Sequence, residues 1–105
     1  MDYSNDVYTI EEITQCIKKL LKQNNDIKEV VLFGSYSRGE ATPASDIDIL
    51  VTIPYNIKPM KMWAFGGDIK NLLKKPVDIF RIKSIDKSSN FYKNVKKDGV
   101  IINID

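Results

Sequence analysis

The most informative absence from this sequence is histidine, which occurs at none of its 105 positions. Histidine is the commonest general base of enzymes and a frequent metal ligand, so any acid–base or metal chemistry here must rest on carboxylates. Cysteine is nearly absent too. Cys16 stands alone, so no internal disulfide can form, and a reducing compartment such as the cytoplasm is expected.

Strong net charge and long apolar runs are also missing. The formal net charge of +2 is too close to neutral to indicate direct binding of nucleic acid. The opening residues, MDYSND, are acidic and polar, unlike a signal peptide, and no apolar run approaches membrane-spanning length. We therefore expect a cytoplasmic protein that makes no membrane contact and forms one domain over residues 1–105.

The rest of the chain alternates between helical and strand patterns. Apolar residues at helical spacing predict helices that start at the Thr9–Glu12 capping box, at Pro59 and at Ser84. Gly66-Gly67 weaken the second helix, and Gly99 ends the third. Runs rich in β-branched residues predict strands over 27–33, 46–53, 77–82 and 100–104, the last at a sheet edge. This order predicts an α/β (α+β) fold, a small mixed sheet with helices packed on it.

The loop between the first two predicted strands, GSYSRGEATPASDID (34–48), ends with two aspartates one residue apart. Side chains alternate along a strand, so Asp46 and Asp48 share one face while Ile47 and Ile49 point into the core. Two like charges side by side repel each other, and a divalent cation would offset that repulsion. Mg²⁺ suits carboxylate oxygens and takes its remaining ligands from water and substrate phosphates.

A third acid, Asp78, stands at the start of the third predicted strand, in PVDIF. If the two strands are neighbours, Asp78 reaches the doublet, and three carboxylates can hold two Mg²⁺ ions about 3.5–4 Å apart for phosphoryl transfer. At the other end of the loop, Gly34 lets the backbone approach a ligand and Ser35 adds a hydroxyl donor. A short helical turn is predicted over 36–41, so this end of the loop can hold the phosphates of a nucleotide.

Two further residues of the loop have more than one reading. Arg38 can pair with a phosphate or tie the loop to Glu40. Ser45 fits a loop cap beside the doublet better than a ligand, but it remains among the candidate nucleotide-binding residues. Elsewhere, large or polarisable side chains fit the core better than a cofactor contact: Cys16, Trp63, Phe65 and Tyr92, together with the apolar stripe Met62, Ile69, Leu72 and Leu73.

The pattern of Gly34-Ser35, ten residues and then the doublet Asp46–Asp48 resembles the signature of the polymerase-β-type nucleotidyltransferase superfamily. FGSYSRGEATPASDIDILV resembles its minimal prokaryotic branch, and the likeness extends to VDIF and the closing DGVIINI. The resemblance implies a polymerase-β-like nucleotidyltransferase fold in a single minimal domain. It also implies metal binding by Asp46 and Asp48, a third carboxylate at Asp78 suited to accept a proton, and phosphate contacts at Gly34 and Ser35.

Family members of this size resemble antitoxins that work beside an RNase of the HEPN class and transfer AMP to its tyrosine. The resemblance thus implies an enzyme with ATP as substrate, two Mg²⁺ ions as cofactor and a small helical HEPN-type toxin as partner in a hetero-oligomer. The alternative is a non-catalytic antitoxin module that masks its partner by complex formation. Three convergent acids favour the enzyme, because a pure binding module does not need them.

Overall fold

The structure is a computed structural model, and it describes residues 3–54, 56–81 and 88–104. Within those ranges no helix has both the length and the apolar character needed to cross a membrane. The elements follow one another as α1 (Ile10–Leu21), β1 (Glu29–Phe33), β2 (Ile47–Thr52), α2 (Pro59–Leu73), β3 (Val77–Arg81), α3 (Asn90–Asp98) and β4 (Val100–Ile102).

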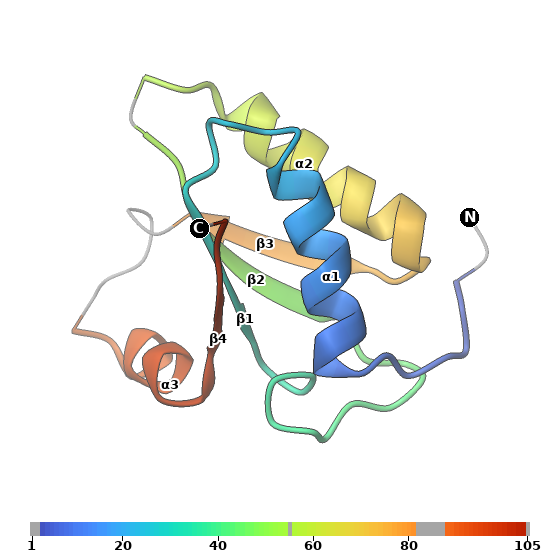
Figure 1. Cartoon of the computed structure of the whole chain (residues 1–105). Coiled ribbons are helices and arrows are strands. Elements are labelled where there is room, and N and C mark those ends of the chain that lie inside the picture. Colours follow the sequence, from blue (N-terminus) through green and yellow to red (C-terminus); the bar gives the residue numbers. More distant parts are fainter. Residues whose placement is uncertain (1–2, 55, 82–87, 105) are drawn as a thin grey trace.

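The four strands form one mixed sheet in the order β3-β2-β1-β4, with β4 at one edge as predicted. β1 runs antiparallel to both β2 and β4, whereas β2 and β3 are parallel and are joined by the crossover helix α2. Helices α1 and α2 lie together on one face of the sheet. α3 lies on the other side of the sheet, next to β4 (Figure 1). The predicted α/β (α+β) fold is therefore confirmed.

Most of the core lies between the sheet and the helices α1 and α2. Alternate residues of each strand enter this core, and Ile47, Ile49 and Val51 of β2 are completely buried, as the alternation predicts. The opposite face of the sheet carries a smaller apolar cluster under α3, formed by Val31, Phe33, Leu50 and Val95. The sheet is thus apolar on both faces, but only one face is fully covered by helices.

The helix starts follow local capping chemistry. In the predicted box, the Thr9 hydroxyl accepts from the Glu12 N–H at 3.0 Å, and the Glu12 carboxylate accepts from the Thr9 N–H at 2.9 Å. α2 begins with Pro59 as predicted and continues through both glycines. Gly66 lies against Ile79 of β3, where a Cβ would be in ordinary van der Waals contact with the isoleucine side chain.

Some boundaries and burial assignments differ from the predictions. The strands are shorter by one to two residues at their ends than the β-branched runs indicate. α3 begins one residue after Ser89, which caps it by accepting from the Tyr92 N–H at 3.1 Å; the predicted cap Ser84 lies outside the described residues. Gly99 follows the last helical residue, in agreement with its predicted role.

Two apolar residues of α2 that were predicted to be in the core are exposed. Trp63 and Leu72 keep 60% and 52% of their surface accessible. The buried face of α2 is formed by Met62, Phe65, Gly66, Ile69 and Leu73. At about 100° per residue, Leu72 and Trp63 lie about 75° and 105° from the centre of this face, on opposite sides of it. The other core predictions hold, since Phe65 is fully buried and Cys16 and Tyr92 pack against the two apolar clusters.

A buried lysine joins three segments that are distant in the sequence. Lys75, between α2 and β3, is completely inaccessible, and its Nζ donates to the carbonyls of Ser4 and Pro43 at 2.8 Å each. Pro43 belongs to the loop that precedes the aspartate doublet. Lys75 therefore anchors both the N-terminal segment and that loop to the start of β3.

Replacing this lysine should destabilise the fold. We expect Lys75→Met to lower the free energy of unfolding by about 2 kcal/mol, because two carbonyls lose their donor while the apolar stem is largely kept. Urea denaturation followed by circular dichroism measures this. The matched control is Lys96→Met, on the exposed surface of α3, which should stay within about 0.5 kcal/mol of the parent. Equal losses in the two variants would contradict the anchoring role.

Candidate active site

The hairpin of β1 and β2 brings the two ends of the polar loop together. Phe33, the last residue of β1, is paired with Asp48 of β2. Gly34 therefore lies against the Asp48 carboxylate, and a Cβ at position 34 would overlap Oδ2 of Asp48. Gly34 also has φ +79°, a left-handed conformation that favours glycine. A glycine at this position is thus required by both the backbone and the neighbouring acid.

The loop after Gly34 closes as a single hydrogen-bonded turn, which agrees with the short turn predicted there. The Arg38 N–H donates to the Gly34 carbonyl at 3.2 Å, and the Glu40 N–H donates to the Ser35 carbonyl at 2.9 Å. The second bond is made possible by Gly39, whose φ is +72°, in the manner of a helix C-terminal cap. The N–H groups at the start of this turn have no preceding turn to accept from them.

The three predicted acids lie on the same face of two adjacent strands. Asp48 and Asp78 are register partners in the parallel pairing of β2 with β3, and Asp46 immediately precedes β2 on the side that Asp48 shares. This face is opposite the one covered by α1 and α2. Asp46 and Asp78 are exposed and Asp48 is half-buried. The neighbouring strands that the sequence analysis required for Asp78 are therefore present.

Burial and mutual repulsion make this row of acids electrostatically unfavourable. The pKa of Asp48 is raised from 3.8 to about 6, first by burial and then by the charges of Asp78 and Asp46, against a smaller lowering by Arg38. The pKa of Asp46 is also raised, by loss of hydration and by the adjacent Asp78 carboxyl. Such a cluster gains from a cation that neutralises it.

The donor set of this row fits magnesium bound together with a phosphorylated substrate. Within the described part of the chain, no three His, Cys, Asp or Glu side chains are arranged to hold a metal ion by themselves. Mg²⁺ sites in phosphoryl-transfer enzymes use one or two carboxylates, with waters and substrate phosphates supplying the other oxygens. The carboxylates of Asp46, Asp48 and Asp78 match that chemistry without forming a closed protein cage.

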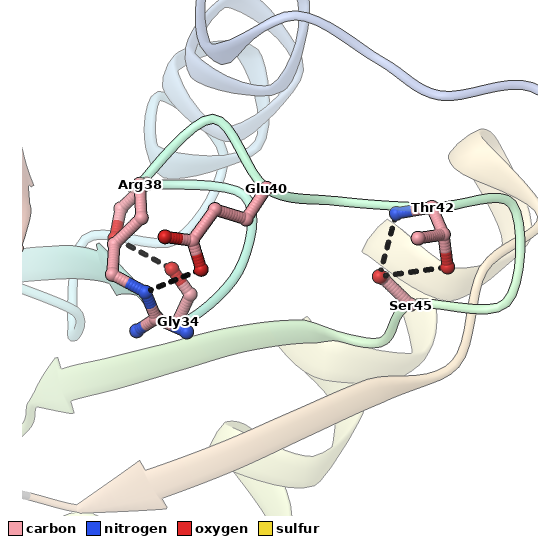
Figure 2. A network of polar contacts seen from close by, with 6 residues as sticks. Gly34, Arg38, Glu40, Thr42 and Ser45 are labelled. Carbon is pink, nitrogen blue, oxygen red and sulfur yellow. Dashed lines mark hydrogen bonds and ion pairs between the residues drawn. The ribbon is translucent and has the colours of Figure 1, made fainter.

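The polar residues of the loop are held by short-range contacts (Figure 2). Arg38 pairs with Glu40, with 3.2 Å between Nε and Oε2, so the second of its two sequence readings is observed. Both side chains are largely exposed, so this pair contributes little to stability and leaves Arg38 available to a ligand. The Ser45 hydroxyl accepts from the Thr42 N–H at 2.8 Å, which is the predicted loop cap.

Among the residues that shape the site, sequence analysis missed Lys75. A lysine between a helix and a strand gives no pattern that distinguishes burial from exposure. Its contact with the Pro43 carbonyl becomes visible only when the loop and the start of β3 are placed together.

Comparison with known proteins places this chain in one family. Residues 15–105 match the family described as polymerase beta, nucleotidyltransferase. The protein adenylyltransferase MntA of Thermococcus cleftensis is 34% identical over 93 residues, which cover 89% of this chain and 92% of that protein. The chain therefore belongs to the polymerase β nucleotidyltransferase family, and the resemblance predicted from the sequence is confirmed.

Solved structures support the same assignment. A chain of a toxin–antitoxin complex crystallised with AMP-PNP superposes with a TM-score of 0.70 at 28% identity, covering 84% of this chain and 70% of that one. The MNT antitoxin structure in complex with a tri-AMPylated HEPN toxin, from Shewanella oneidensis, gives a TM-score of 0.64 at 25% identity, over 87% and 69% of the two chains. The polymerase-β-like fold is thus confirmed.

The raised pKa of Asp48 leads to a pH-dependent stability. A carboxyl whose pKa is higher in the folded than in the unfolded state costs no stability below pH 4 and its full penalty above pH 6. Without divalent cations, Asp48→Asn should therefore match the parent near pH 4 and exceed its free energy of unfolding by about 1 kcal/mol at pH 8, after allowance for solvent screening. Urea denaturation at both pH values, in EDTA, measures the difference.

The control for this measurement is Asp68→Asn, an exposed position on α2. It should show no comparable growth of stability between the two pH values. A gain in Asp48→Asn that is the same at pH 4 and pH 8 would show that the ionised Asp48 carboxylate is not its source.

Proposed function

We propose that this chain is an Mg²⁺-dependent adenylyltransferase that acts in the cytoplasm as an antitoxin, moving AMP from ATP to a tyrosine of a HEPN-type toxin. The observation that carries the proposal is the convergence of Gly34, Asp46, Asp48 and Asp78 at one end of one sheet face. The similar proteins named above, an adenylyltransferase and antitoxins bound to toxins, support the choice of reaction and partner.

The roles of the residues follow from their positions. The turn that starts at Gly34 and Ser35 would bind the triphosphate through backbone N–H groups and the Ser35 hydroxyl, with Arg38 as a further cation and Ser45 as a further contact. Asp46, Asp48 and Asp78 would hold two Mg²⁺ ions, which neutralise the phosphates and the charge that develops during transfer. Binding at both ends of the loop would fix the α-phosphate for in-line attack.

Asp78 is proposed to take the proton. The acceptor hydroxyl would lose its proton to the Asp78 carboxylate while its oxygen bonds to the α-phosphorus, and the bond from that phosphorus to the bridging oxygen would break, releasing pyrophosphate. The chain contains no histidine, the commonest general base, and Asp78 supplies a carboxylate, which can also accept a proton. In this proposal the second protein presents the acceptor hydroxyl and brings its own docking surface.

Nucleotide binding should depend on magnesium and on the doublet. Calorimetric titration with ATP should show binding with Mg²⁺ and at least a tenfold loss of affinity in EDTA, because the phosphates and the acids then repel each other. Asp46→Ala should show a similar loss with Mg²⁺ present, while Asp68→Ala, on α2, should bind like the parent. Equal affinity for ATP with and without Mg²⁺ would refute the metal assignment.

Transfer can be tested on the product of the gene adjacent to this chain's gene, which the proposal expects to be a small helical HEPN-type protein. Incubation with this chain and Mg·ATP should add one or more AMP units to a tyrosine, as weighed by intact-protein and peptide mass spectrometry. Asp78→Asn should keep Mg·ATP affinity within a few-fold and lose about 100-fold or more in transfer rate, the usual contribution of a general base. A neighbour that stays unmodified and is still inhibited by complex formation supports the non-catalytic antitoxin module instead.

A further inference from the structure

Three phenylalanine rings form a cluster on the sheet face that carries the acids. Phe33 of β1, Phe80 of β3 and Phe91 of α3 lie with ring centroids 5.4 to 5.8 Å apart, in tilted and edge-to-face arrangements. These separations and angles are those that aromatic rings prefer. The cluster joins residues from three elements, so its position is fixed by the sheet and by the docking of α3.

The cluster adjoins the row of acids directly. Phe33 is the register partner of Asp48, and Phe80 follows Asp78 by two residues, on the same face of β3 and about 7 Å along the strand. Asp78 therefore has a carboxylate beside it on the neighbouring strand and an aromatic ring next to it along its own strand. A group attached to an acceptor hydroxyl at Asp78 can therefore reach Phe80.

Burial within the cluster is uneven. Phe33 is 8% exposed and lies over the apolar residues beneath α3, as a core residue does. Phe80 and Phe91 remain 37% and 41% exposed, although both pack on Phe33. Packing between the sheet and α3 explains the burial of Phe33. It does not explain Phe80 and Phe91, whose rings remain accessible to a ligand beside the acids.

We propose that the exposed rings of Phe80 and Phe91 bind the aromatic ring of the acceptor, and so select a tyrosine over an aliphatic hydroxyl. This inference rests on the proposed function and adds the residues that recognise its protein substrate. A phenol ring stacked on these two rings places its hydroxyl toward Asp78, because Phe80 and Asp78 project from the same face of one strand. Serine or threonine offers no ring for this contact.

The position of the rings beside Asp78 favours binding of the acceptor over binding of the adenine base. Phe80 flanks Asp78, the proposed proton acceptor, whereas the phosphate-binding turn at Gly34 starts at the end of β1, on the other side of β2 from β3. Stacking of the adenine base is the competing reading, and it predicts a different kinetic signature.

The test measures transfer by Phe80→Ala, Phe80→Leu and Phe91→Ala with the helical neighbour protein as acceptor. We expect Phe80→Ala to raise the KM for the acceptor about tenfold and to leave the Kd for Mg·ATP within twofold. Phe80→Leu keeps apolar area without a flat ring and should recover only part of this loss. Trp63→Ala removes an exposed aromatic from α2, on the other face of the sheet, and is the matched control.

A second arm replaces the modified tyrosine of the neighbour by serine. The parent should transfer AMP to this serine at least tenfold more slowly, and Phe80→Ala should reduce that difference.

Weaker Mg·ATP binding by Phe80→Ala with an unchanged acceptor KM would overturn the assignment in favour of the adenine base. If Phe80→Ala changes neither the Kd for Mg·ATP nor the KM for the acceptor, the proposed role of these rings is wrong. A parent chain that leaves every tyrosine of the neighbour unmodified would instead refute the proposed function. Thermal melting of each variant verifies that it is folded.

Discussion

The register between β1 and β2 is the constraint on which the rest of the site depends. It pairs Phe33 with Asp48, so the polar loop must return to its own starting point, and Gly34 meets an acid fourteen residues later in the chain. A shift of one residue would turn Asp48 into the apolar core and bring an isoleucine to the surface. The buried isoleucines of β2 resist that shift, so the apolar core on one face maintains the chemistry on the other.

Alternating patterns made much of the fold and of the candidate site predictable. The run DIDILV fixes a strand and the faces of its side chains at once, because a period of two admits one burial pattern. The capping box at Thr9 and Glu12 and the proline at the start of α2 gave helix starts by local chemistry alone. Adjacency of Asp78 to the doublet needed one further step, the parallel crossover of β2 and β3 through α2.

Features that depend on tertiary contacts were not predictable. Trp63 has the apolar character of a core residue, but only the direction in which α2 faces the sheet decides that it is exposed. The burial of Lys75 and the clustering of three phenylalanines depend on segments far apart in the sequence. Hydrophobicity tells which residues prefer burial, not which of them find a partner, and this is why flanking positions of a helix are assigned poorly.

The division of the acids between a hairpin and a crossover also has a consequence for the order of folding. The hairpin of β1 and β2 closes a short stretch of chain, so it needs little loop entropy and can form early. Asp78 joins only after α2 has formed and β3 has docked at the sheet edge, a contact between residues thirty positions apart. A nascent or partly unfolded chain therefore has the aspartate doublet without the third carboxylate, and the complete row of three acids becomes a property of the fully folded domain.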